Sequence, residues 1–112
     1  MKYHNLKTFY KDVKYDSKKE ARRAYELELL QRAGHISCLE RQKKFELQPS
    51  FKIHGKIELA ITYQADFYYY DNLKKIWVVE DVKSSITKTL PVYRIKKKLL
   101  LYKYQDVLFV ET

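Results

Sequence analysis

The spacing of apolar residues along the chain changes from a helical period to alternation near residue 34. A helix is expected from Lys18 to about Ala33, with Ser17 and Glu20 as a capping box at its start. Gly34 is expected to end it in a left-handed conformation. Its apolar residues form one broad face, at Ala21, Ala24, Tyr25, Leu27, Leu29, Leu30 and Ala33. Such a helix is suited to lie on a sheet.

Strands are expected where apolar and polar residues alternate. Pro49 should end the first of them because proline cannot donate to a ladder. Turns are expected near His54-Gly55 and at Asp71-Asn72, and the second turn should join two strands as a hairpin. The predicted strands cover Ile36–Leu47, Glu58–Tyr70, Lys75–Lys83 and Val107–Val110, and the segment Phe51–Lys56 is strand-like around the first turn.

A second helix is expected from Thr89, as its cap, to about Tyr104, with Pro91 in the first turn. Its predicted buried stripe comprises Val92, Ile95, Leu99, Tyr102 and Leu101. Its predicted basic face comprises Arg94, Lys96, Lys97, Lys98 and Lys103. The element order α-β-β-β-α-β places residues 1–112 in one domain of the α/β (α+β) class.

The charge and the aromatic content of the chain indicate a class of binding partner. The chain has 23 basic and 14 acidic residues, a net charge of +9, together with 11 tyrosines and 5 phenylalanines. This composition indicates an anionic partner, with nucleic acid first; the alternative is a domain with a merely basic surface. The basic and aromatic segment Met1–Tyr15 is interpreted as an arm, with or without a short hairpin, that lies on a phosphate backbone through Lys7 and Lys11. A loosely packed terminus is the alternative.

The composition of the chain excludes several kinds of protein and site. Two glycines, Gly34 and Gly55, are too few for a glycine-rich phosphate-binding loop. One cysteine, Cys38, permits no disulfide within the chain. The chain has neither a signal-peptide pattern nor an apolar run long enough to span a membrane, so an intracellular location without membrane contact is expected.

Candidate chemistry lies at Asp66, Asp81 and Lys83. The hairpin places the two acids at comparable distances from its turn, and Asp81 and Lys83 share a strand face. Two carboxylates on adjacent strands repel unless a cation lies between them, and hard oxygen ligands select Mg²⁺ or Mn²⁺. Glu20 is a third candidate acid, although the capping box also explains it. The alternative for Asp66 and Asp81 is ordinary strand-end charges paired with lysines, and Glu80, on the opposite face, is interpreted as an exposed strand charge.

With Glu20, Asp66 and Asp81-Val82-Lys83 in this element order, the chain resembles the PD-(D/E)XK nuclease superfamily. More narrowly, it resembles a family of small phage and prophage proteins. The similar segments are Tyr15–Ala21, Phe45–Phe51, Ile61–Phe67 and Val79–Lys83, and Ala65 stands where the superfamily motif has proline.

The resemblance implies a restriction-endonuclease-like core with a central mixed sheet flanked by two helices. It also implies a Mg²⁺-dependent DNA endonuclease, related to Holliday-junction resolvases, very-short-patch-repair endonucleases and transposon end-cleaving nucleases. Asp66, Asp81 and the Val82 carbonyl would be metal ligands, Glu20 would support metal or water, and Lys83 would be the catalytic lysine. A phage or prophage protein would act in the cytoplasm of the bacterial host.

The lysines and arginine of the second helix would hold the DNA backbone. No base-reading element is evident, which favours recognition of structured or branched DNA in phage recombination or replication. Branched DNA suits a homodimer, formed through Tyr68-Tyr69-Tyr70 or the final strand; packing within the chain is the alternative for both segments. Two rival functions stay open: a nucleic-acid-binding module without catalysis, and a phage interaction protein that uses exposed tyrosines.

Overall fold

The structure, a computed structural model, describes residues 8–10, 13–15, 17–83 and 87–112. Two hairpins and one 3₁₀ helix lie outside the core sheet and its two helices. The hairpins are β1 (Thr8–Tyr10) with β2 (Val13–Tyr15) and β4 (Phe51–Ile53) with β5 (Lys56–Glu58), and the 3₁₀ helix is η1 (Thr87–Thr89). The core elements are α1 (Lys18–Arg32), β3 (Ile36–Gln48), β6 (Ile61–Asp71), β7 (Ile76–Asp81), α2 (Pro91–Lys103) and β8 (Val107–Glu111).

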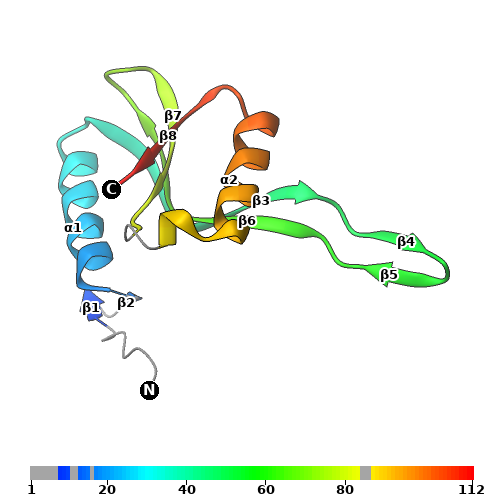
Figure 1. The fold of residues 1–112 in the computed structure, drawn as a ribbon. Helices are drawn as coiled ribbons and strands as arrows, with labels where there is room; N and C mark the ends of the chain where they lie inside the picture. Colours follow the sequence, from blue (N-terminus) through cyan, green and yellow to red (C-terminus); the bar gives the residue numbers. More distant parts are fainter. Residues whose placement is uncertain (1–7, 11–12, 16, 84–86) are drawn as a thin grey trace.

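The core is one four-stranded sheet in the order β3-β6-β7-β8. β3, β6 and β7 are antiparallel neighbours, whereas β8 runs parallel to β7 after the α2 crossover, so the sheet is mixed. The helices α1 and α2 cover opposite faces of the sheet and so form two layers with it (Figure 1). Within β7, Val78 packs under α1 and its neighbour Val79 packs under α2. The predicted α-β-β-β-α-β order and the central mixed sheet flanked by two helices are confirmed.

Local capping signals determine the ends of α1. The Ser17 hydroxyl accepts a hydrogen bond from the Glu20 backbone N–H at 3.1 Å. At the other end Gly34 has φ 82° and donates its N–H to Gln31, while His35 donates to Leu30. This is a Schellman-type end, and α1 stops one residue before the predicted Ala33.

The predicted orientation of α2 is wrong. Val92, Ile95, Leu99 and Tyr102 are exposed, and Leu100 is fully buried instead. Apolar residues occur on both sides of this helix, so periodicity alone does not decide which side meets the sheet. Leu90, not Thr89, is the N-cap residue and makes no side-chain cap bond, while Pro91 does begin the helix.

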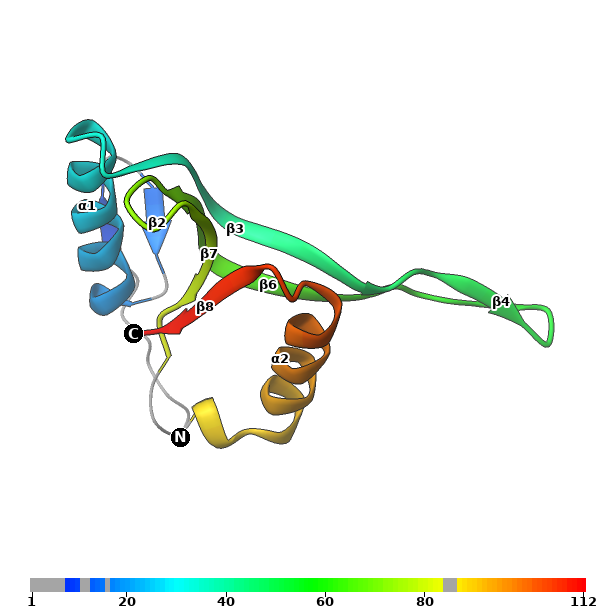
Figure 2. The same ribbon diagram turned by 90° about the horizontal axis from the view of Figure 1, so that it is seen from above.

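The β4–β5 hairpin continues β3 and β6 away from the two layers (Figures 1 and 2). This hairpin, which is distinct from the N-terminal segment, is called the β4–β5 arm. Its turn lies at the predicted His54-Gly55, where φ is 49° and 73°. The predicted strand Glu58–Tyr70 is two strands, since β5 ends at Glu58 and β6 begins at Ile61.

The tyrosines proposed for dimer formation serve the fold of the chain itself. Tyr69 is buried, and Tyr68 stacks on Trp77 with ring centroids 4.8 Å apart. Tyr70 meets the same Trp77 edge to face at 5.3 Å. Neither helix of the described ranges has the length and apolar character that crossing a membrane would need.

Candidate metal centre

Asp66 and Asp81 lie side by side where β6 and β7 diverge. The regular register ends at Phe67 opposite Glu80, so the next two positions are these acids. Side chains replace the ladder there: Asp81 Oδ1 accepts the Asp66 N–H at 3.0 Å, and Asp66 Oδ2 accepts the Val82 N–H at 2.8 Å. The predicted adjacency of the two carboxylates is therefore present.

A change of face in β6 helps to place Asp66. Tyr63 and Ala65 belong to the cluster under α2, whereas Phe67 and Tyr69 belong to the cluster under α1. Strict alternation would put all four on one face. The face changes at Asp66, and the opposing β3 residue, Gln42, has φ 56°.

Asp81 is a buried carboxylate with unused capacity. It is 0% exposed, and no hydrogen-bond partner for its Oδ2 atom exists among the described residues. Burial raises the pKa of Asp81, although Lys83 and the Asp66 N–H act in the opposite direction. Lys83 Nζ lies 3.6 Å from Asp81 Oδ1, so the predicted pairing of acid and amine on one strand face is present. A buried acceptor without a donor is uncommon and suits a cation.

Glu111 and Tyr93 join this site, and sequence reasoning missed both. Glu111 is the register partner of Asp81 across the parallel β7–β8 pair. The Tyr93 hydroxyl donates to Glu111 Oε2, and Lys97 Nζ lies 3.1 Å from Glu111 Oε1. The Tyr93 ring centroid lies 5.5 Å from Lys83 Nζ. The signal in the sequence was an acid directly after the second parallel strand, because the carboxyl ends of parallel neighbours meet.

Burial and hydrogen bonding shift both new members of the site. Burial, and then the hydrogen bond to Glu111, raise the pKa of Tyr93, which keeps its hydroxyl a donor. Partial burial alone would raise the pKa of Glu111, but the bonds from Tyr93 and Lys97 outweigh it and the pKa is lowered. Glu111 is thus held as a carboxylate between two donors.

Glu20 lies in a different hydrogen-bonded chain. It is buried, and its Oε2 accepts from the Gln42 side chain at 3.0 Å; Gln64 in turn donates to Gln42. This chain reaches β6 two residues before Asp66. In the part of the chain that the structure describes, no group of three or more His, Cys, Asp or Glu side chains is placed to hold a metal. The structure therefore brings Asp66, Asp81 and Lys83 together, and it links the Glu20 carboxylate to β6 through Gln42 and Gln64. A role of Glu20 at the metal stays a prediction.

The interpretation of Glu80 as an exposed charge is wrong. Glu80 is fully buried under α1, where Arg23 Nε and an Arg23 terminal nitrogen donate to its carboxylate at 2.5 and 3.1 Å. The Tyr69 hydroxyl donates at 2.6 Å and the Thr112 hydroxyl at 3.3 Å. A cation and two hydroxyls replace water around this carboxylate.

The residues predicted to bind DNA are only partly gathered. Arg94, Lys97 and Lys98 line one pocket of about 290 Å³ with Lys88 and Leu101. Lys96 is half-buried, and Lys103 donates to the Glu46 carbonyl at 2.9 Å. Lys7 and Lys11 lie outside the described residues.

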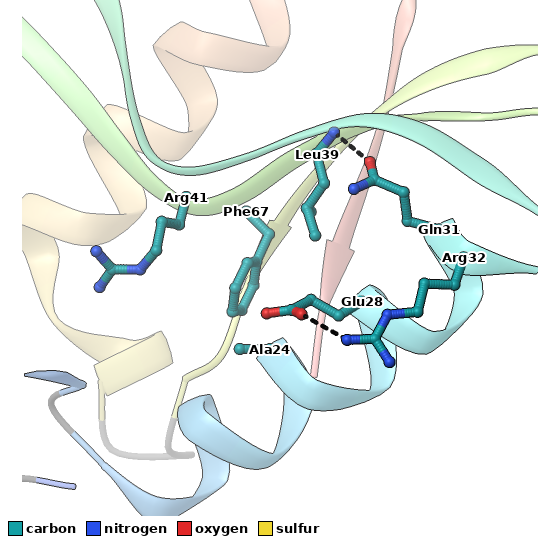
Figure 3. A pocket seen from close by; sticks show the side chains of 7 residues that line it. All are labelled: Ala24, Glu28, Gln31, Arg32, Leu39, Arg41 and Phe67. Carbon is teal, nitrogen blue, oxygen red and sulfur yellow. Dashed lines mark hydrogen bonds and ion pairs between the residues drawn. The ribbon is translucent and has the colours of Figure 1, made fainter. Parts of the chain in front are cut away.

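A second pocket, of about 300 Å³, lies between α1 and the sheet (Figure 3). An ion pair between Glu28 and Arg32 at 3.8 Å and a bond from the Leu39 N–H to Gln31 at 2.9 Å cross its lining (Figure 3). Neither Asp66, Asp81 nor Lys83 lines it. This pocket is therefore separate from the carboxylate pair.

A family model described as "Protein of unknown function (DUF1064)" matches residues 1–110. Searches of curated proteins and of solved structures found no match.

Proposed function

We propose that this chain, which belongs to the family described as "Protein of unknown function (DUF1064)", is a divalent-metal-dependent DNA endonuclease. The observation that carries the proposal is the Asp66–Asp81 pair with Lys83 Nζ 3.6 Å from Asp81. We also propose that the protein belongs to the PD-(D/E)XK superfamily, acts on structured or branched DNA, and works in the cytoplasm of a bacterial host as a phage or prophage product.

The residues present fit Mg²⁺ or Mn²⁺. Asp66 and Asp81 supply hard carboxylate oxygens, and the carbonyl oxygen of Val82, the residue after Asp81, would be a further ligand. Asp81 Oδ2 is buried and accepts no hydrogen bond from the described residues. Mg²⁺ usually keeps several waters and uses one or two carboxylates, so a third acid is not required. When bound, the ion would polarise a phosphodiester and lower the pKa of the attacking water.

The chain's own groups would orient this chemistry. Each Asp carboxylate accepts a hydrogen bond from a backbone N–H across the β6–β7 hairpin, Asp81 from Asp66 and Asp66 from Val82, which would hold the pair in place before substrate binds. Lys83 would neutralise charge that develops on the phosphate or orient the water. Tyr93, held by Glu111, lies beside the Lys83 ammonium and limits where it can move.

Cleavage of linear, flapped and four-way-junction DNA of matched sequence, with Mg²⁺, Mn²⁺ or EDTA, tests the proposal. We expect cleavage that requires the metal and is faster on branched DNA. Lys83→Met should lower the cleavage rate by about 10²-fold, because one stabilising charge is lost, and should leave Mn²⁺ binding in place. Mn²⁺ titration calorimetry measures the second point.

Lys74→Met is the matched control, since Lys74 lies exposed in the turn far along the same hairpin. It should cleave like the parent. Metal-dependent cleavage that Lys83→Met retains in full would exclude the assigned role of Lys83. Binding of DNA without cleavage on any substrate or metal would favour a non-catalytic nucleic-acid-binding module.

The pocket that Arg94 and Lys98 line supports DNA binding under either function. Arg94→Ala/Lys98→Ala should weaken DNA binding and reduce the steepness of log K against log salt concentration by about 2. The variant makes two fewer phosphate contacts, so fewer counterions are released on binding. Fluorescence anisotropy over a salt series measures it. Lys44→Ala/Lys74→Ala removes the same charge from exposed positions elsewhere and should leave the slope within about 0.5 of the parent. Equal slopes for the two double variants would remove α2 from the DNA interface.

A further inference from the structure

The β4–β5 arm carries apolar side chains that the described chain leaves uncovered. Phe51 and Ile53 are 44% and 46% exposed; Ile57, which lies opposite Lys52 on the other face of the ribbon, is 71% exposed. β4 and β5 contact mainly each other, and the arm projects from the two layers in both views (Figures 1 and 2). A two-stranded ribbon is only marginally stable in water, so an apolar ribbon of this kind calls for a partner.

The strand register defines what each face of the arm presents. Phe51 lies opposite Glu58 and Ile53 opposite Lys56, and cross-strand partners share a face. One face therefore carries an apolar row on β4, Phe51 and Ile53. Beside it lies a row of opposite charges on β5, Glu58 and Lys56.

This face is complementary to itself in one orientation. Two arms can pack face to face and antiparallel about a two-fold axis that runs across the strands of both ribbons. In this packing β4 lies over β4 of the second copy, and β5 lies over β5. Phe51 then meets Ile53 of the second copy, and Glu58 meets Lys56 of the second copy, each contact occurring twice. A parallel two-fold arrangement would instead bury Phe51 against Glu58. The antiparallel packing leaves the two bodies at opposite ends.

We propose that the arm is a homodimer interface in which two copies of this chain clasp arms in this antiparallel packing. Charge argues for a second copy rather than DNA, because the face presents one lysine and one glutamate and no cationic surplus for phosphates. The cationic pocket lies instead on α2. Paired apolar rows with matched charges are what an isologous interface needs.

Sedimentation velocity on the full chain and its charge-swap variants tests the interface. The parent chain should form a dimer. Lys56→Glu and Glu58→Lys should each raise the dissociation constant at least about tenfold, because each places two like-charged contacts in the dimer. Lys56→Glu/Glu58→Lys should restore the dimer. An equimolar mixture of the two single variants should form a heterodimer, since one arm then carries two acids and the other two lysines.

Phe51→Ser removes apolar area without changing charge and should also yield monomer. Circular dichroism and thermal unfolding check folding, which these arm variants should keep because the arm lies outside both core clusters. A parent chain that is monomeric at about 1 mM would overturn the inference, since even a weak dimer with a Kd of that order would show. Single variants that dimerise like the parent, or a mixture without heterodimer, would also overturn it. Loss of DNA affinity in Lys56→Glu from a monomeric parent would make DNA the occupant instead.

Discussion

Asp81→Asn is expected to lower metal-dependent cleavage by about 10⁴-fold, which corresponds to about 5 kcal/mol of transition-state stabilisation. The substitution keeps the shape of the side chain and an oxygen that can accept the Asp66 N–H. It removes the negative charge on the buried Oδ2 side of the site. A nuclease assay with Mg²⁺ over several hours measures the loss.

The same variant should be at least as stable as the parent without metal. Burial raises the pKa of Asp81, so the folded state holds its proton more tightly than the unfolded state does. The free energy of unfolding therefore falls as pH rises from the unfolded pKa to the higher folded pKa, and the cost persists at pH 7. An uncharged amide avoids that cost. Thermal unfolding in EDTA should show an equal or higher Tm for Asp81→Asn.

With metal present, the Tm of the parent should exceed that of Asp81→Asn. Millimolar Mg²⁺ or Mn²⁺ should raise the Tm of the parent by ligand linkage and leave that of Asp81→Asn unchanged. Asp106→Asn, which changes an exposed acid of the turn before β8, should behave like the parent in both assays. Cleavage by Asp81→Asn at the parental rate would remove Asp81 from the chemistry.

Local signals explain why the first half of the fold was predictable. Ser17 and Gly34 determine the ends of α1 through hydrogen bonds to residues close in the sequence. The adjacency of Asp66 and Asp81 follows from a short hairpin, where distance from the turn limits the register. Both depend on contacts close in sequence.

Predictions failed where distant contacts decide. The stripe of α2 from Val92 to Tyr102 was expected in the core but is exposed. The spacing of apolar residues does not show which of two apolar faces of a helix the sheet will cover. The hydrogen bond from Gln42 of β3 to the Glu20 carboxylate was likewise not predicted, because it joins residues that are distant in the sequence. Glu111 was missed because its position beside Asp81 depends on the parallel pairing of β7 and β8 after a crossover.

Asp81 and Glu80 show how neighbouring acids receive opposite environments. Strand alternation turns Asp81 toward α2 and Glu80 toward α1. Asp81 keeps an oxygen without a donor among the described residues, which suits a ligand from outside. Glu80 is bonded by Arg23, Tyr69 and Thr112. Asp81 is therefore the acid proposed for function, whereas the bonds of Glu80 give it a stabilising role.

Glu80→Ala is expected to lower the free energy of unfolding by about 3–5 kcal/mol, the usual cost of breaking a buried ion pair by removing one partner. Arg23, whose side chain is 25% exposed, would lose both bonds to the carboxylate, and the Tyr69 hydroxyl would lose its acceptor in the core. Each kcal/mol lowers the Tm of a domain of this size by about 4–8 °C. Urea and thermal unfolding followed by circular dichroism measure the change.

Glu26→Ala is the matched control, because Glu26 also pairs with Arg23, at 3.1 Å, but lies exposed on the helix surface. Its loss should cost less than about 1 kcal/mol. Arg23→Ala should cost about as much as Glu80→Ala, since it leaves a fully buried carboxylate without its cation. The double variant Arg23→Ala/Glu80→Ala should then lose less than the sum of the two, because neither charge remains to be solvated. Strict additivity would mean that the Arg23–Glu80 pair does not stabilise the α1 layer through their mutual bond.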